Sequence, residues 1–128
     1  MLRLKEPVIE DSEKLYEAIK KMPFYENGFG NEFADLSYSG FRDIGIRIMQ
    51  ESARGINLKP GRVPQTYFFL WDDDKIVGLF KVRHYLNSAL SSGSGHIGFG
   101  IIREYRGQHY ASQGLRVRIT LSVTRNSE

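Results

Sequence analysis

The chain has 128 residues, 41% of them hydrophobic, and a formal net charge of +3 at pH 7. This length and composition predict one folded domain rather than a disordered chain, and the absence of cysteine excludes a disulfide framework, a thiol nucleophile and a thiolate metal site. The basic bias is too weak to predict a nucleic-acid partner, and without a signal-peptide core or an apolar run of membrane-spanning length we expect a cytoplasmic protein with no membrane partner.

The first predicted elements are a strand and a helix. Residues 2–5 alternate apolar and charged side chains, as a short half-buried strand does. Apolar residues then recur at helical spacing, with Asp11 or Ser12 as the expected cap and Pro23 as the stop. Residues 24–30 are aromatic and glycine-containing, which indicates a loop that either covers the core or lines a substrate entrance.

A second helix is expected from Ser37 or Ser39 to Arg54, with Gly55 as its C-terminal stop. Gly45 weakens this helix by up to about 1 kcal/mol relative to alanine. One apolar stripe of the helix is predicted to face the core. Its members are Phe41, Ile44, Ile48 and Met49.

A β-hairpin is expected next. Residues 66–71 are mostly aromatic or aliphatic, which predicts a strand that is covered on both faces. The acidic residues 72–74 predict a solvated turn rather than a metal site. Residues 76–84 form the return strand, and residues 95–102 form the strand after it. Alternation divides the return strand into Ile76, Gly78, Phe80, Val82 and His84 on one face, and Val77, Leu79, Lys81 and Arg83 on the other.

Residues 95–111 carry the strongest functional signal. They comprise a glycine-punctuated apolar strand, a basic turn and the start of a helix, and both the N–H groups of such a turn and the helix dipole attract a phosphate. The turn Arg106-Gly107-Gln108-His109-Tyr110-Ala111 resembles the acyl-CoA pyrophosphate loop of the GCN5-related N-acetyltransferases, whose pattern is Gln or Arg, two residues, Gly, one residue, and Gly or Ala. The upstream phrases Arg83-His84-Tyr85-Leu86-Asn87 and Gly95-His96-Ile97-Gly98-Phe99-Gly100-Ile101 resemble one bacterial branch of that family.

The resemblance implies an α/β (α+β) fold of the acyl-CoA N-acyltransferase type, with a mostly antiparallel mixed sheet flanked by helices. It implies an acetyltransferase that moves an acetyl group from its cosubstrate, acetyl-CoA, to an unidentified amine acceptor. The family's cofactor-binding positions fall on the end of the strand, for the pantetheine arm, and on the turn, for the pyrophosphate. In this sequence they are Phe99, Gly100, Ile101, Ile102, Arg106, Gly107, Gln108, His109, Tyr110 and Ala111.

His109 departs from the family pattern, because it occupies the position of the second glycine. Its Cβ can hinder the approach of the backbone to the phosphate. Alternatively, a protonated ring can donate a charge-assisted hydrogen bond to the same phosphate. We favour the steric effect, since the glycine of the motif serves backbone access.

No catalytic residue is assigned firmly from the sequence. The candidate bases are His96, His84 and Glu104, and of these His96 shares a strand face with Gly98 and Gly100. The family's general acid, often a tyrosine in the C-terminal part, has no matching position. The spacing of the histidines predicts no metal site.

The resemblance covers residues 1–115, which we interpret as the N-terminal portion of an acetyltransferase domain. Residues 116–128 diverge, because their alternation is typical of a strand where the family has a helix. Either the chain is a C-terminally truncated or frame-shifted form of a longer acetyltransferase, which we favour, or a real strand follows a short helix. A truncated chain could be inactive, so the alternative function is a non-catalytic CoA-binding or protein-interaction module completed by a second chain, as in a homodimer.

Overall fold

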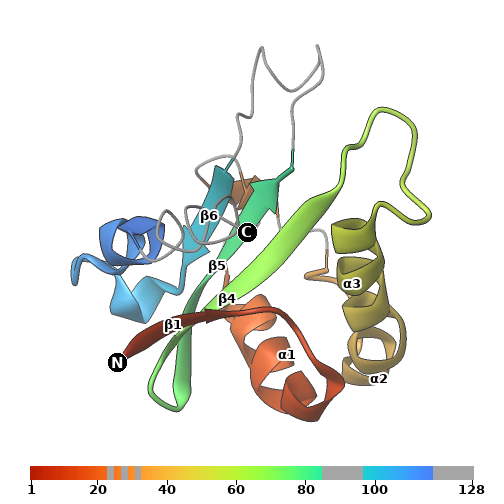
Figure 1. Ribbon diagram of the computed structural model, residues 1–128. Helices are drawn as coiled ribbons and strands as arrows, with labels where there is room; N and C mark the ends of the chain where they lie inside the picture. Colours follow the sequence, from red (N-terminus) through yellow and green to blue (C-terminus); the bar gives the residue numbers. More distant parts are fainter. Residues whose placement is uncertain (23–24, 27–28, 31–32, 85–96, 117–128) are drawn as a thin grey trace.

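The computed structural model describes residues 1–22, 25–26, 29–30, 33–84 and 97–116. Its centre is a four-stranded antiparallel sheet with helices on both faces, which confirms the expected mixed α and β fold (Figure 1). The strands of this sheet are β1 (Leu2–Lys5), β4 (Gln65–Asp72), β5 (Lys75–Arg83) and β6 (Ile97–Ile101). They lie side by side in the order β1-β4-β5-β6, so the β4–β5 hairpin occupies the middle of the sheet.

Two hydrophobic clusters fill the spaces on either side of the sheet. The first lies against helices α1 (Ser12–Lys21) and α3 (Ile46–Arg54), and the second lies under the helical residues 110–116 (Figure 1). Alternate residues of β4 contribute to the two clusters, as Phe69 and Phe68 do. Strand β4 is therefore buried on both faces, as its sequence predicts.

Helix α1 begins without the side-chain cap that the sequence suggests. A 3-10 turn, η1 (Ile9–Asp11), leads directly into the helix, so Asp11 does not have the extended backbone of a capping residue. The Asp11 carboxylate instead accepts a 2.6 Å hydrogen bond from Lys5 Nζ. Ser12 Oγ lies 2.9 Å from the hydroxyl of Tyr38. Both polar groups thus contact neighbouring elements rather than the first helical turn.

The second helical region runs from α2 (Tyr38–Gly40) through a π-helical turn, η2 (Phe41–Gly45), into α3. Its predicted start and stop are correct. Ser37 Oγ accepts a 3.1 Å hydrogen bond from the Gly40 amide, and Gly55 ends α3 in the left-handed region with φ 72°.

The predicted apolar stripe of this helix is only partly correct. Phe41, Ile46 and Met49 are buried, whereas Ile44 and Ile48 are 48% and 44% exposed. The cause is the π turn, which holds more residues than an α-helical turn and so rotates every later position around the axis. Ile46 replaces Ile48 on the buried face.

A β-bulge interrupts the alternation predicted for β5. Leu70 pairs with Gly78 and Trp71 pairs with Ile76, so Val77 is the extra residue. Ile76 consequently joins the cluster that contains Leu79, and Val77 joins the opposite cluster. The predicted faces are wrong at these two residues and correct from Gly78 onward.

A short two-stranded ribbon lies beside β6, formed by β2 (Tyr25–Glu26) and β3 (Phe29–Gly30) (Figure 1). Residues 24–30 are therefore not the simple loop expected from their composition, although residues 24, 27 and 28 lie outside the described part. Because each strand of the ribbon has only two residues, it is too short to show the alternation of apolar and polar side chains that marks a strand in a sequence.

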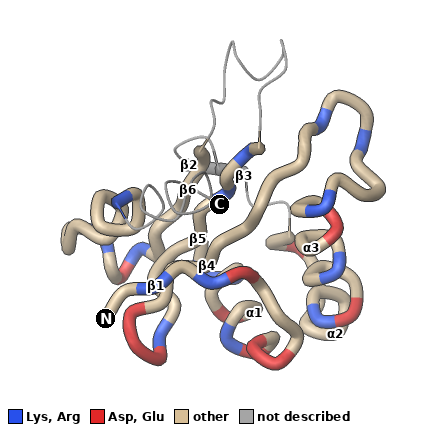
Figure 2. The backbone as a smooth tube through the Cα atoms, viewed as in Figure 1, with Lys and Arg blue, Asp and Glu red and all other residues tan. Residues whose placement is uncertain are grey.

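Charged residues of both signs are interspersed along α1 and α3, and an acidic segment marks the β4–β5 turn (Figure 2). The N-terminal ammonium group of Met1 lies 2.6 Å from Asp73 Oδ1 at this turn. In the part of the chain that the structure describes, no helix combines the length and the apolar character needed to cross a bilayer.

Candidate functional site

The chain leaves the sheet at the end of β6 and enters the predicted phosphate-binding turn. The Ile102 amide donates a 2.9 Å hydrogen bond to the carbonyl of the bulged Val77, and the Ile102 side chain is buried in the core. A 3-10 turn, η3 (Arg103–Tyr105), follows, and the Tyr105 amide donates to the Ile102 carbonyl. Ile102 thus fixes the point from which the turn projects.

Two residues of this turn have left-handed backbone conformations. Gly107 has φ 82°, and His109 has φ 64°. Glycine adopts this region freely, but in other residues the Cβ makes it unfavourable. His109 therefore adopts the backbone conformation of the glycine whose place it takes. The helix begins directly after it, at residue 110, and the Gln113 amide donates to the His109 carbonyl.

An open pocket of about 450 Å³ lies between the end of β6, the turn and the helix start. Most of the predicted cofactor-binding residues line it: Phe99, Ile101, Arg106, Gly107, His109, Tyr110 and Ala111. Tyr105 and Ser112 also line the pocket, and both adjoin the recognised motif in sequence. Gly100, Ile102 and Gln108 were predicted to bind the cofactor but do not line this pocket.

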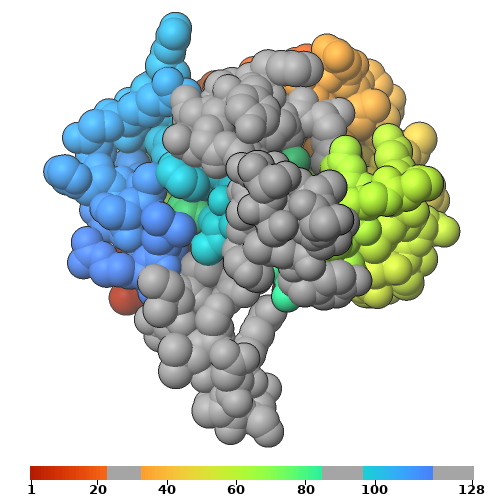
Figure 3. Space-filling model, turned by 90° about the horizontal axis from the view of Figure 1, so that it is seen from above, coloured from red at the N-terminus to blue at the C-terminus, as the bar shows by residue number. Residues whose placement is uncertain are grey.

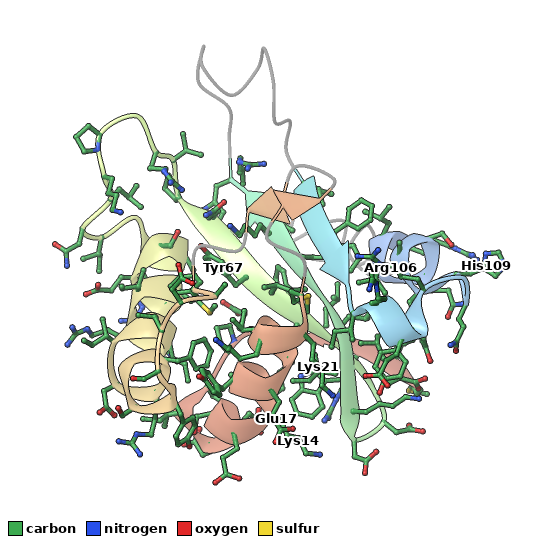
Figure 4. All side chains as sticks on the ribbon, turned by 180° about the vertical axis from the view of Figure 1, so that it is seen from behind. Lys14, Glu17, Lys21, Tyr67, Arg106 and His109 are labelled. Carbon is green, nitrogen blue, oxygen red and sulfur yellow. The ribbon has the colours of Figure 1, made fainter. Side chains whose placement is uncertain are left out.

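Arg106 and His109 lie on different sides of the turn (Figure 4). Arg106 lies next to the end of β6, where its Nε donates a 3.3 Å hydrogen bond to the Ile101 carbonyl. His109 lies on the outer side and is exposed. The cationic Arg106 is thus held close to the strand, whereas the His109 ring extends away from it.

The helix after the turn is anchored to the far end of the hairpin. The hydroxyl of the buried Tyr110 donates a 2.6 Å hydrogen bond to Asp72 Oδ2. This bond lowers the pKa of Asp72 and, together with burial, raises the pKa of Tyr110. Sequence reasoning missed Asp72, because a run of acidic residues in a turn is fully consistent with solvation.

Close packing also fixes the same helix against the sheet. A Cβ added to Gly114 would lie 2.6 Å from Cζ of Phe80 on β5 and 3.2 Å from Leu70 Cδ2. Glycine at this position lets the helix backbone approach the sheet more closely than any other residue would allow. The sequence contains Gly114 but gives no local signal of its partner.

The described candidate bases do not meet at the pocket. His84 lies just past the end of β5, with Nε2 2.8 Å from Thr66 Oγ1, and about 20 Å of strand separates it from Gly78, which pairs with the end of β6. Glu104 is 57% exposed and lies 3.5 Å from Lys21 of α1. His96 lies outside the described residues. The catalytic assignments therefore remain predictions.

Comparisons with known proteins support the fold. A scan against models of protein families finds no match, and a search of curated proteins finds none either. A solved structure described as a probable acetyltransferase superposes with a TM-score of 0.63 at 18% sequence identity, covering 93% of this chain and 60% of that chain. This chain thus spans three fifths of that protein's length, and it has an acetyltransferase-like fold.

Proposed function

We propose that this chain is the acyl-CoA-binding portion of a GCN5-related N-acetyltransferase, which moves an acetyl group from acetyl-CoA to an amine. The observation that carries the proposal is the left-handed backbone of His109, at the position where the motif has glycine. Positive φ is uncommon outside glycine, and the turn nevertheless adopts it at His109. The acetyltransferase-like fold and the position of the turn directly after β6 support the same proposal.

The proposed site uses mainly backbone groups. The amides of residues 106–111 would bind the pyrophosphate, and the backbone at the end of β6 would bind the pantetheine arm. Arg106 would contribute a positive charge next to the pyrophosphate, from a position already fixed by its bond to Ile101. Acetyl-CoA supplies an activated thioester, and this chain's contribution is to hold and orient it.

A second candidate function is CoA binding without acetyl transfer. Among the described residues, no aspartate or glutamate lines the pocket, and both described candidate bases lie elsewhere. In this case β6, at the edge of the described sheet, would pair with a second copy of the chain. Acetylation of an amine by the purified chain would argue against this candidate.

Isothermal titration with acetyl-CoA and with pantetheine tests the proposed site. We expect acetyl-CoA to bind at least about tenfold more tightly, since charge-assisted hydrogen bonds to phosphate contribute about 1.5–3 kcal/mol. Arg106→Ala should remove much of this preference. Arg47→Ala, which changes an exposed arginine on α3, controls for the loss of net charge. Equal affinities for the two ligands would refute the phosphate site.

Acetyl transfer is measured separately, as the CoA that is released from acetyl-CoA in the presence of small amines and peptides. We expect little release by this chain alone, because no base and acid pair is assigned in the described part. Rapid release with one amine would identify the acceptor class and would show that this expectation is wrong.

A further inference from the structure

We propose that a second small-molecule site lies between α3 and the connection to β4, and that it takes a short branched aliphatic molecule with one hydrogen-bond donor. A pocket of about 180 Å³ is present there. It lies on the opposite side of the molecule from the candidate CoA pocket, as Figure 3 shows for residues 103–116 in blue and residues 55–64 in yellow-green. The two pockets share no lining residue.

The walls of this second pocket are mainly aliphatic. They are formed by Ile48, Ile56, Leu58 and Val63. The other residues that line the pocket are polar, charged or aromatic: Glu51, Ser52, Asn57, Lys59, Arg62, Gln65 and Tyr67. Ile48 and Ile56 are 44% and 45% exposed, so a ligand that covers them removes apolar surface from water. Apolar walls combined with polar groups that orient a ligand are typical of small-molecule sites.

Two of the buried polar side chains that line the pocket come from β4. Gln65 and Tyr67 are 7% and 2% exposed, and Gln65 Nε2 donates a 3.2 Å hydrogen bond to the Tyr67 hydroxyl. This hydrogen bond involves the amide nitrogen of Gln65, and the amide oxygen, Oε1, takes no part in it. Among the described residues no donor reaches Gln65 Oε1. Among the described residues the fully buried, unpaired side-chain atom is Trp71 Nε1 and not Gln65 Oε1, so Gln65 Oε1 retains access to solvent and can accept an N–H or O–H from a ligand in the pocket.

The site is held in shape before any ligand binds. The Tyr67 ring is fixed by an edge-on contact with Phe33, at 5.9 Å between ring centroids, and by the Lys81 ammonium, 5.4 Å from the ring centroid. On the opposite wall, Asn57 Nδ2 donates to Glu51 Oε2 at 3.1 Å, and the Ile56 amide donates to the Glu51 carbonyl. Little ordering of the protein is then required on binding, which favours affinity.

The size of the pocket limits the ligand. At about 30 Å³ for each water in the liquid, the volume corresponds to roughly six water molecules, or to one short branched alcohol. We therefore choose 3-methylbutan-1-ol as the probe, because it has an aliphatic branch and one O–H donor. The ketone 4-methylpentan-2-one has a similar shape but can only accept hydrogen bonds.

Titration of the full chain with each probe, followed by NMR of labelled isoleucine methyl groups, tests the proposal. We expect the alcohol to shift the Ile48 and Ile56 methyl resonances and to leave Ile44, which is exposed on the π-helical turn η2 outside the pocket, unchanged. The ketone should bind about tenfold more weakly, the effect of losing one good hydrogen bond. Equal binding of the ketone, equal shifts at Ile44, or no saturable shift would each overturn the proposal.

One variant of Gln65 and a matched pair of isoleucine variants complete the experiment. Gln65→Met removes the acceptor at similar size and should abolish the preference for the alcohol over the ketone. Ile48→Trp should block the exposed mouth and abolish binding, whereas Ile44→Trp, a matched change at an exposed position of the same helix, should leave it unchanged. Acetyl-CoA titrations should be unaffected by the isoleucine variants, so failure here is separable from failure of the proposed function. Retained alcohol binding in Ile48→Trp would refute the site.

Discussion

Tyr110 and Asp72, 38 residues apart in the sequence, share a 2.6 Å hydrogen bond that joins the helix after residues 106–109 to the tip of the central hairpin. The pKa of Asp72 is lowered chiefly by this bond, with further contributions from the N-terminal ammonium and Lys75. The pKa of Tyr110 is raised by the same bond and by burial. The pair therefore links the stability of the helix to pH at both ends of the scale.

We expect Tyr110→Phe to destabilise the chain most at neutral pH. The Asp72 carboxylate, whose pKa is lowered in the folded chain, stabilises the fold at pH values above its unfolded pKa of 3.8. This contribution disappears as the pH falls through the still lower folded pKa. The Tyr110 phenol, whose pKa is raised in the folded chain, stabilises the fold below its unfolded pKa of 10.0. This contribution is lost as the pH rises through the higher folded pKa. Urea unfolding of both proteins from pH 2 to 11 measures the difference. A difference in unfolding free energy between the two proteins that does not change with pH would contradict a role for the hydrogen bond to the ionised Asp72 carboxylate.

The His109 backbone predicts the effect of restoring glycine. Relief of the left-handed strain, roughly 1–2 kcal/mol, exceeds the added flexibility of the unfolded glycine chain, roughly 0.5–1 kcal/mol, so His109→Gly should be slightly more stable. If the Cβ hinders the phosphate, the variant should also bind CoA about fivefold more tightly, equivalent to roughly 1 kcal/mol.

His109→Ala is the matched control, because it keeps the Cβ and removes the ring. Under the steric explanation it binds CoA like the wild type, and affinity changes little between pH 6 and pH 8. If the protonated ring binds phosphate instead, both variants bind more weakly than the wild type at pH 6, and wild-type affinity is lower at pH 8 than at pH 6. Calorimetric titration at the two pH values separates these results.

Gly114 should not tolerate a larger residue. An alanine Cβ would lie 2.6 Å from the Phe80 ring, so Gly114→Ala should cost about 1–3 kcal/mol, as overpacking does. The cost should fall when Phe80→Leu is also present, because the smaller side chain leaves room. Chemical denaturation of the two single variants and the double variant gives the coupling energy. Strictly additive costs would show that the close contact is not the cause.

The π turn makes opposite predictions for two neighbouring isoleucines. Ile46 is 2% exposed, so Ile46→Ala should cost about 2–5 kcal/mol, whereas Ile44→Ala, at 48% exposure, should change stability by less than about 0.5 kcal/mol. A regular α-helix starting at Phe41 would instead place Ile48 and Ile44 nearer the core. Thermal unfolding of the two variants distinguishes the two arrangements.

Local sequence patterns were sufficient to predict most of the described fold. The alternation of residues 2–5, the apolar run of β4 and the helix stop at Gly55 depend on neighbours in the chain, and all three predictions are confirmed. Apart from the ribbon of β2 and β3, which was expected to be a loop, the order of the described helices and strands was correct for the same reason. The class of fold followed from this order and from the turn after β6.

The errors arose where distant contacts decide the structure. The π turn and the bulge at Val77 each add one residue to a regular repeat, and no residue type marks them reliably. Asp11 is a residue type that often caps helices, but its carboxylate accepts a hydrogen bond from Lys5 instead. At the candidate site, the sequence identified the turn itself and missed Asp72, whose role depends on a tyrosine far along the chain.

The bulge in β5 has a practical consequence for protein engineering. Deleting Val77 would make the hairpin regular and would leave Ile76 on its present face, opposite Trp71, but it would remove the carbonyl to which the Ile102 amide is bonded. The turn that follows β6 would then begin at a different position along the neighbouring strand. Libraries that aim to change ligand preference should therefore vary residues 106–109 and keep the hairpin length constant, because a single deletion there would alter the whole turn at once.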